Sequence, residues 1–432
     1  MIDWISSPSG PLRGEIRVPG DKSISHRAIM FAALADGTSR ITGFLEGEDT
    51  LATARAFARM GVRIEAPRPS ERIVHGVGLH GLRAPDGEID CGNAGTGMRL
   101  LAGLLAGQKF DSILTGDESL SKRPMQRVIE PLARMGAKIV SHDGLPPLRI
   151  HGKQRLHGID YAPPVASAQV KSAILLAGLY ADGETRVREP HPTRDYTESM
   201  LRAFGWPIES GSGWAKVSGG QGLRATSVMV PADFSSAAFF IVAATLVPRS
   251  ELVLRDVGMN PRRTGLLVTL RAMGADIRES NQRLQGGEPV ADLVVSHAPL
   301  RGIDVPAGSV AGMIDEFPIL FVAAATAQGT TRIRGAAELR VKESDRIAVM
   351  AKGLRALGAS IEETPDGAVI EGGKFAGGEV DSAGDHRCAM SFAVAGLLAA
   401  TPVRIADCAN VATSFPGFVE LARACGVFLT SA

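Results

Sequence analysis

Several basic residues lie in short polar loops that lead directly into apolar segments with a helical pattern. Lys22 and Ser23 begin one such segment, in Asp21-Lys-Ser-Ile-Ser-His-Arg27, and Arg123 and Arg194 precede two others. A cation at the start of a helix opposes the helix dipole, so it needs a negative partner there. Free backbone N–H groups at the same place also favour anions. The pattern therefore indicates binding of small anionic ligands.

A glycine-rich loop and two mixed-charge segments extend this pattern. Cys91-Gly-Asn-Ala-Gly-Thr-Gly-Met-Arg99 runs into an apolar segment, but its glycines match neither the Walker A nor the Rossmann spacing. Arg340-Val-Lys-Glu-Ser-Asp-Arg346 and Asp385-His-Arg387 combine cations with carboxylates, and Asp315-Glu316 begins another apolar segment. Any one of these charges alone is typical of a solvated surface. Their recurrence at the same kind of position favours a function.

The composition excludes several classes of protein. The 432 residues carry 47 Lys+Arg against 46 Asp+Glu and only 5% aromatic residues, which argues against a nucleic-acid-binding protein. The longest apolar runs, 236–247 and 319–327, are shorter than the ~18 residues that span a membrane. The N-terminus has no signal-peptide pattern, and the four cysteines and nine histidines show no metal-ligand spacing. We expect a reduced, cytoplasmic protein without a metal.

The elements that must position these residues form an internal repeat. A segment that approximates Leu-Arg-Ala-Met-Gly-Ala-x-Ile recurs six times, the last copy being looser, at intervals of 68 to 84 residues. Each copy predicts the end of an amphipathic helix, a glycine C-cap and a strand. The six glycines are Gly61, Gly136, Gly205, Gly274, Gly358 and Gly426.

An alanine-rich apolar helix precedes each glycine segment. The six predicted helices cover residues 23–35, 96–106, 167–180, 235–246, 315–327 and 386–400. Because apolar residues occupy nearly every side of them, these helices should be buried. With short β-rich stretches between them, the chain is predicted to be α/β (mixed, α+β), with six βαβαββ-type repeats.

Six such repeats make two domains of three, and a division near residues 228–234 balances them. The first strand, residues 14–18, could pair with either half. Repeats of this length could also form an open solenoid. Buried alanine-rich helices favour two compact domains instead.

Four segments together resemble the 5-enolpyruvylshikimate-3-phosphate synthase family over nearly the whole chain. They are residues 21–27, 92–99, 340–346 and 385–387. The family transfers the enolpyruvyl group of phosphoenolpyruvate to the 5-hydroxyl of shikimate 3-phosphate, in chorismate and aromatic amino-acid biosynthesis, and is the target of glyphosate. The resemblance implies a cytoplasmic, monomeric transferase that needs no cofactor and acts on small molecules, with no nucleic-acid or membrane partner.

The resemblance also implies an architecture, an inside-out α/β barrel of two domains. Residues 21–230 would form the domain of repeats 1–3. Residues 1–20 and 231–432 would form the domain of repeats 4–6, and the active site would lie in the cleft between the two.

Residue roles follow from the same resemblance. Asp315 is similar to the family's proton acceptor and Glu343 to its proton-transfer residue at the methylene carbon, while Lys22 would contact both substrates as a third catalytic residue. Shikimate 3-phosphate would be held by Lys22, Ser23, Arg27, Ser167, Ala168, Gln169, Arg194, Asp315 and Lys342. Phosphoenolpyruvate would be held by Lys22, the backbone of Gly95, Arg123, Gln169, Arg346 and Arg387.

These residue types suit that chemistry. The two substrates bring two phosphates and two carboxylates, so dense Lys and Arg groups are needed to offset their repulsion. Two carboxyl groups in different environments can remove one proton and deliver another. The same cations can stabilise the phosphate as it leaves.

The chain departs from the common family pattern in one place and follows a divergent class in others. Many members have a Lys before the Thr-Phe-Pro near the C-terminus, whereas this chain has Ala412-Thr413-Ser414-Phe415-Pro416. Ser167-Ala-Gln169 and Thr193-Arg-Asp195 look like the second class of the family, which is associated with glyphosate tolerance. Gly95 is instead the small residue linked to sensitivity, so the two signals oppose each other.

Two alternatives come from outside this activity. One is the related transfer of enolpyruvyl to UDP-N-acetylglucosamine, but no cysteine here lies in a loop like the reactive one of that enzyme. The other is a non-catalytic anion-binding protein on the same scaffold. Asp315 and Glu343 argue against it, since a binder of anions gains nothing from carboxylates beside its ligands.

Overall fold

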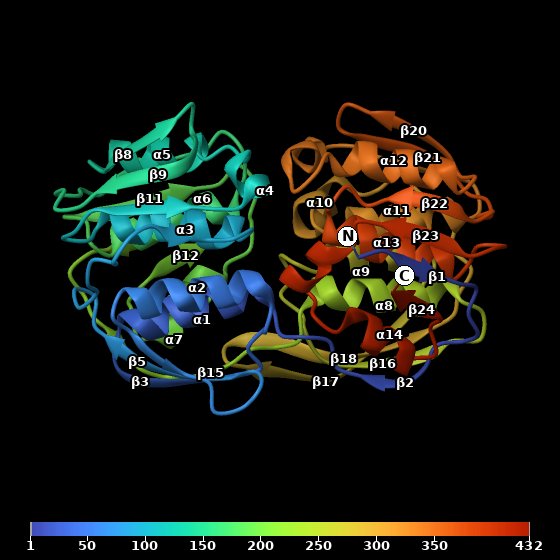
Figure 1. Ribbon diagram of the computed structural model, residues 1–432, viewed down its shortest axis with the longest axis horizontal. Coiled ribbons are helices and arrows are strands. Elements are labelled where there is room, and N and C mark those ends of the chain that lie inside the picture. The colour runs from blue at the N-terminus through green and yellow to red at the C-terminus, as the bar shows by residue number, and fades with distance from the viewer. Residues whose placement is uncertain (1, 432) are drawn as a thin grey trace. The chain divides into compact units, whose positions relative to one another are not determined.

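The computed structural model describes residues 2–431, and the chain divides into two compact units, which are treated one at a time (Figure 1). The N-terminal unit comprises Gly20–Val230 and Gln285–Gly287. The C-terminal unit comprises Met1–Pro19, Pro231–Leu284 and Glu288–Ala432. No helix among the described residues combines the length and the apolar character that crossing a membrane requires.

Three almost completely buried helices form the centre of each unit, which confirms the prediction of six buried helices. Those of the N-terminal unit are α1 (Lys22–Leu34), α3 (Gly95–Ala106) and α6 (Ala168–Gly178). Those of the C-terminal unit are α8 (Phe234–Leu246), α11 (Phe317–Thr326) and α13 (His386–Gly396). Their small residues allow close packing: a methyl group added to Gly103 of α3 would lie 2.1 Å from the carbonyl oxygen of Ala173 of α6.

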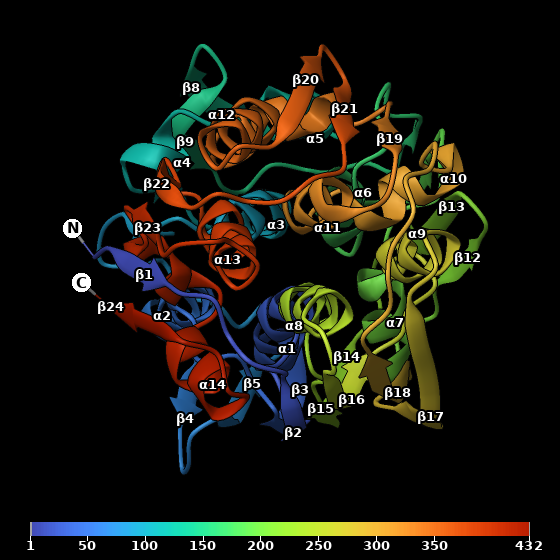
Figure 2. The same ribbon diagram turned by 90° about the vertical axis from the view of Figure 1, so that its right-hand side faces the viewer.

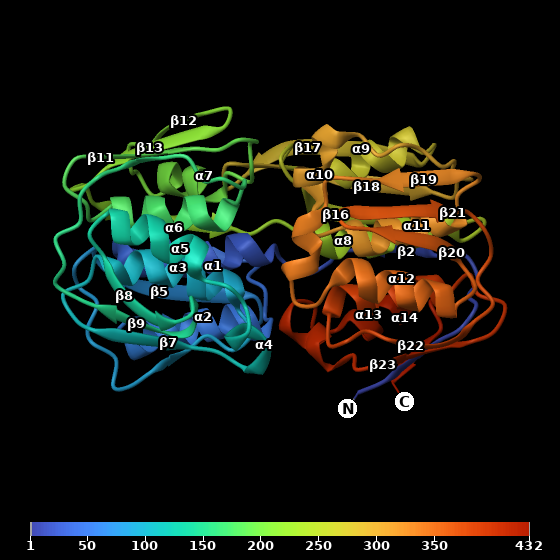
Figure 3. The same cartoon turned by 90° about the horizontal axis from the view of Figure 1, so that it is seen from above.

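Three short sheets surround the buried helices of the N-terminal unit. In Figure 3, α1, α3 and α6 lie between two of these sheets. The strand orders are β14 (Leu223–Arg224), β3 (Ala35–Thr42), β5 (Glu71–Val77), β4 (Arg63–Glu65), with β15 (Ser227–Met229) also beside β3; β6 (Ile89–Asp90), β7 (Ser112–Thr115), β9 (Leu145–His151), β8 (Lys138–His142); and β10 (Asp160–Tyr161), β11 (Glu184–Arg188), β13 (Trp214–Ser218), β12 (Glu209–Gly211).

The C-terminal unit repeats the same plan. Figure 2 shows α8, α11 and α13 end-on, with strands on several sides of them. The strand orders are β22 (Gly378–Asp381), β23 (Val403–Ala406), β1 (Trp4–Ser6), β24 (Leu429–Ser431); β17 (Asp276–Gln285), β18 (Glu288–Ser296), β16 (Glu251–Gly258), β2 (Arg13–Ile16); and β19 (Thr330–Ile333), β21 (Gly367–Glu371), β20 (Ser360–Thr364).

The remaining helices lie outside the buried ones and are shorter or one-sided. They are α2 (Glu48–Arg59), α4 (Glu118–Ser121), α5 (Gln126–Arg134), α7 (Tyr196–Ala203), α9 (Gly265–Ala272), α10 (Ala307–Val310), α12 (Arg346–Ala356) and α14 (Phe418–Ala424). The six repeat glycines follow the ends of α2, α5, α7, α9, α12 and α14 with φ between +79° and +103°. This is the left-handed conformation that favours glycine, and a strand follows each one, as predicted.

The first strands of the chain belong to the C-terminal unit. Strand β2 runs parallel to β16, with Gly14 opposite Leu252, and β1 pairs antiparallel with both β23 and β24. The predicted strand at residues 14–18 is therefore Arg13–Ile16 in the structure, and its partner, which the sequence left open, is β16.

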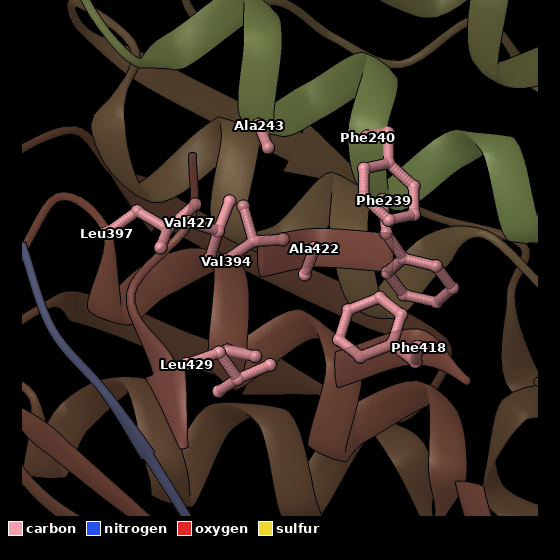
Figure 4. A pocket seen from close by; sticks show the side chains of 10 residues that line it. Phe239, Phe240, Ala243, Val394, Leu397, Phe418, Ala422, Val427 and Leu429 are labelled. Atoms are coloured by element: carbon pink, nitrogen blue, oxygen red, sulfur yellow. The ribbon is translucent and has the colours of Figure 1, made fainter. Parts of the chain in front are cut away.

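A small pocket in the C-terminal unit is apolar and separate from the charged groups described below (Figure 4). Phe239 and Phe240 of α8, Val394 of α13, and Phe418 of α14 are among its lining residues. No charged side chain lines it, so it is a packing gap in the core and not a place for an anionic ligand.

Candidate active site

The starts of the three buried helices meet in the N-terminal unit. The Arg27 guanidinium of α1 donates to the Ser172 hydroxyl of α6 at 2.8 Å, and the Arg99 guanidinium of α3 donates to the Gln169 side-chain oxygen of α6 at 3.0 Å. Because these contacts join residues in the early turns of each helix, the three N-termini lie at the same end of the unit. Their dipoles therefore add to a positive field there.

Lys22 is held at the start of α1 by a buried carboxylate. Its ammonium group forms an ion pair with Asp49, whose side chain is only 4% exposed, whereas that of Lys22 is 21% exposed. Asp21 caps the same helix by accepting from the Ile24 N–H at 2.8 Å. Ser23 lies beside Lys22 and is partly exposed. Lys22 and Ser23 are thus in place to meet a ligand.

Arg27 is built into the protein more deeply than the sequence suggests. Besides Ser172, its guanidinium donates to the Thr197 hydroxyl at 2.8 Å and to the Ser23 carbonyl oxygen at 2.9 Å. Burial lowers the pKa of Arg27 to about 10, against the opposing effect of the Glu198 carboxylate. The group therefore remains positively charged at neutral pH.

A second group of cations surrounds Gly95 at the start of α3. A methyl group added to Gly95 would lie 3.0 Å from both the Arg123 and the Arg99 guanidinium groups. Arg123 is 7% exposed and donates to the Asn93 side-chain oxygen at 2.5 Å. The Gln169 amide donates to Thr96 at 2.8 Å while its oxygen accepts from Arg99. The loop that leads into α3 therefore brings its own backbone close to two guanidinium groups.

The remaining predicted residues of this unit lie at the starts of α6 and α7. Ser167 caps α6 by accepting from the Val170 N–H at 3.4 Å, and Ala168 is the first residue of that helix. Arg194 precedes α7, is partly exposed, and is close enough to Arg27 for its charge to lower the pKa of that group. An anion bound here would reduce the repulsion between these two cations.

Asp315 lies among three cations in the C-terminal unit. Its carboxylate oxygens are 3.5 Å from Arg263, 3.9 Å from Lys342 and 3.6 Å from Arg346. Both arginines are nearer to this carboxylate than Lys342 is. The Asp315 carboxylate therefore lies in a strongly positive environment.

Arg346 is the most buried cation of this site, with 1% of its side chain exposed. It donates to Asp385 at 2.8 Å and to Glu343 at 2.6 Å. Although burial alone raises the pKa of the Asp385 carboxyl, the Arg346 guanidinium holds it below its usual value. Glu343 meets the same guanidinium, so Arg346 is shared between two carboxylates.

Arg387 and Glu316 join the helix starts of the C-terminal unit. Arg387, in the first turn of α13, donates to the Asp315 carbonyl oxygen at 3.1 Å, and its guanidinium is 3.6 Å from the Glu316 carboxylate. Ser235 of α8 donates to that carboxylate as well. The starts of α8, α11 and α13 therefore meet, as do those of the other unit.

The structure brings the predicted residues into two clusters, one in each unit. The N-terminal cluster contains Lys22, Ser23, Arg27, Gly95, Arg123, Ser167, Ala168, Gln169 and Arg194; the C-terminal cluster contains Asp315, Lys342, Glu343, Arg346 and Arg387. Sequence reasoning missed Asp49 and Arg263, and it named Glu316 and Asp385 without identifying their partners. A cation in a buried segment indicates that a carboxylate pairs with it. The sequence does not show which carboxylate that is, because the two residues are far apart along the chain.

Comparisons with known proteins agree on one family. The family model described as EPSP synthase (3-phosphoshikimate 1-carboxyvinyltransferase) matches residues 6–421. A 3-phosphoshikimate 1-carboxyvinyltransferase of Xanthomonas oryzae pv. oryzae is 66% identical over 430 residues, covering 99% of this chain and 98% of that protein. One of Xanthomonas campestris pv. campestris is 65% identical, with the same coverage.

Solved structures agree with these sequence relatives. An EPSP synthase from Acinetobacter baumannii superposes with a TM-score of 0.90 at 52% identity, covering 100% of both chains. The α/β fold of buried helices and surrounding sheets is therefore shared with experimentally determined structures.

Proposed function

Because the chain belongs to the EPSP synthase family, we propose that the two clusters hold the substrates of that family's reaction and carry its proton transfers. The reaction moves the carboxyvinyl group of phosphoenolpyruvate to the 5-hydroxyl of shikimate 3-phosphate and releases phosphate. It makes the chain a transferase of aromatic amino-acid biosynthesis. One observation supports this assignment of residues. In each unit, cations gather where the three buried helices begin.

In this proposal the N-terminal cluster supplies most of the binding groups. Lys22, Ser23, Arg27 and Arg194, with the Ser167-Ala168-Gln169 turn, bind shikimate 3-phosphate. The backbone of Gly95, Arg123 and Gln169 bind phosphoenolpyruvate, and Lys22 contacts both substrates. The crowding of cations around Gly95 and Arg27 supports this division, because an anionic ligand bound there would reduce the repulsion between the neighbouring cations.

The C-terminal cluster supplies the proton-transfer groups. Asp315 removes the proton of the acceptor hydroxyl, and Lys342 binds shikimate 3-phosphate beside it. Glu343 delivers a proton to the methylene carbon, while Arg346 and Arg387 bind phosphoenolpyruvate. Since Arg346 donates to Glu343 in this structure, an anionic ligand that draws the guanidinium away would make protonation of Glu343 easier.

The working state of the protein is inferred from its family. We propose that it acts as a monomer in the cytoplasm, as membership of the EPSP synthase family favours. The charges needed for the substrates come from side chains, so the proposed chemistry uses no cofactor.

Phosphate release tests this function directly. The purified protein is incubated with phosphoenolpyruvate and either shikimate 3-phosphate or UDP-N-acetylglucosamine, with acceptor-free reactions as the control. We expect phosphate release only with shikimate 3-phosphate. No turnover with that acceptor, or faster turnover with the nucleotide sugar, would show that the assignment is wrong.

Gly95 gives a prediction about one substrate alone. A Gly95→Ala variant places its methyl group 3.0 Å from the Arg123 and Arg99 guanidinium groups, tighter than ordinary packing. We expect KM for phosphoenolpyruvate to rise about 10-fold, with a much smaller change in KM for shikimate 3-phosphate. Steady-state kinetics with each substrate varied in turn measures both values.

The matched control for Gly95 is Gly308→Ala. A methyl group at Gly308 meets nothing within 4 Å, so this change adds the same atoms in open space. Its kinetics should equal those of the unchanged protein. Equal rises in KM for both substrates in Gly95→Ala would contradict the assignment of Gly95 to phosphoenolpyruvate.

A further inference from the structure

A buried ion cluster lies at the junction of three elements in the N-terminal unit. The Lys171 ammonium of α6 is 2.9 Å from the Glu189 carboxylate and 2.8 Å from the Glu198 carboxylate. Glu189 directly follows β11, and Glu198 lies on α7. Each of the three side chains is only 1% exposed. The cluster is defined here as Lys171, Glu189 and Glu198.

Burying this cluster in the core costs free energy. Each buried charge loses its hydration, and replacing such ions by apolar residues of similar size is often neutral or stabilising. The two carboxylates also outnumber the single ammonium group, and one oxygen of Glu198 is buried without a hydrogen-bond partner. A contribution to stability therefore does not explain the ion cluster. The residues that the cluster holds in place explain it better.

One end of the cluster holds the loop that carries Arg194. The Thr193 hydroxyl donates to one oxygen of Glu189, and the Thr193 backbone N–H donates to the other at 3.3 Å. Glu189 thus fixes the backbone of the residue immediately before Arg194. Since Lys171 holds Glu189, the position of the Arg194 loop is tied to helix α6.

The other end of the cluster holds Arg27. Ser172 follows Lys171 in the chain, and Thr197 precedes Glu198; their hydroxyls bond to each other at 2.8 Å, and each accepts from the Arg27 guanidinium at 2.8 Å. The Glu198 carboxylate also favours the charged form of Arg27, whose pKa burial lowers. The same junction of α6 and α7 therefore fixes a second cation.

We infer that Lys171 is a positioning residue for shikimate 3-phosphate, which it does not itself touch. It locks α6 to α7 so that Arg27, Arg194 and the Ser167 turn present their groups in one fixed arrangement. The inference rests on the proposed function of those three groups. We expect the larger effect on this substrate, because the groups that the cluster holds, the Thr193 backbone beside Arg194 and the two hydroxyls that meet Arg27, are those assigned to it.

The main test is Lys171→Met, which keeps an unbranched side chain of nearly the same length and removes its charge. We expect the dissociation constant and KM for shikimate 3-phosphate to rise about 10-fold or more. KM for phosphoenolpyruvate should change less than about 2-fold. Isothermal titration calorimetry with shikimate 3-phosphate measures binding independently of turnover. Equal changes for both substrates, or none, would overturn the inference.

The matched control lies three residues further along the same helix. Ile174 is completely buried and is not part of the ion cluster, so Ile174→Ala should lower Tm through lost packing. We expect it to leave both KM values unchanged. If Ile174→Ala raises KM for shikimate 3-phosphate as much as Lys171→Met does, general loosening of the helix is the cause and the inference falls.

The Thr193→Val variant tests how the Arg194 loop is held and keeps the ion cluster intact. It also tests the inference if the Lys171→Met variant does not fold. Valine has nearly the same shape but lacks the hydroxyl that meets Glu189. We expect KM for shikimate 3-phosphate to rise about 3- to 10-fold, with an unchanged KM for phosphoenolpyruvate. No rise would contradict the role given to Glu189. Failure of the unchanged protein to bind shikimate 3-phosphate would instead overturn the proposed function.

Discussion

Replacing Asp315 by alanine is expected to lower kcat by about 10²-fold or more, with both substrates at saturating concentration. The carboxylate lies within 4 Å of Arg263, Lys342 and Arg346, which stabilise its charge and keep it ready to accept a proton. Saturating concentrations separate this loss from a loss of binding, because a group that only bound shikimate 3-phosphate would change KM and leave kcat intact.

The control for Asp315 is the same substitution at an exposed carboxylate. Asp304 is 66% exposed and lies 3.6 Å from Arg332, so Asp304→Ala should retain full activity. Thermal unfolding of both variants checks that the chain is folded. An Asp315→Ala protein that keeps more than half of kcat would show that another group accepts the proton.

Replacing Arg346 by methionine is expected to destabilise the C-terminal unit by about 3–5 kcal/mol. The change leaves the Asp385 carboxylate, whose side chain is 0% exposed, without the guanidinium that meets it at 2.8 Å. It also removes a proposed phosphoenolpyruvate cation, so activity should fall as well. Urea unfolding gives the change in the free energy of unfolding, and phosphate release gives the activity.

A double variant separates these two effects. In Arg346→Met with Asp385→Asn the lone buried charge is gone, and asparagine can still cap α13 as Asp385 does. Much of the lost stability should therefore return, while phosphoenolpyruvate turnover stays low. If the double variant is no more stable than the single one, an uncompensated Asp385 is not the source of the destabilisation.

The repeat could be predicted from the sequence because short-range sequence patterns determine it. A glycine after an amphipathic helix, followed by a strand, needs no knowledge of the rest of the chain, and all six predicted glycines have a positive φ. The buried helices were equally readable, since a helix apolar on every side has to lie inside. The predicted ends differ by a few residues: His386–Gly396 was expected to run to residue 400.

The ion pairs could not be predicted from the sequence, because their two partners are far apart along the chain. Lys171 stands alone in the apolar segment Ala168–Gly178, which signals a buried partner, but nothing local identifies Glu189 or Glu198. Lys22 and Asp49 are likewise paired only by the packing of α1 on α2. Local patterns thus predict elements, whereas tertiary packing selects which charges meet.

The pairing of β1 between β23 and β24 has a consequence for the order in which the protein can be assembled. Nearly all of the N-terminal unit is one continuous stretch, Gly20–Val230, and can close its core while later residues are still being synthesised. The sheet that contains β1 instead joins Trp4 to Ile405 and to Ser431. Strand β1 must therefore wait, unpaired, until the last repeat has left the ribosome, and such long-range pairing is slow.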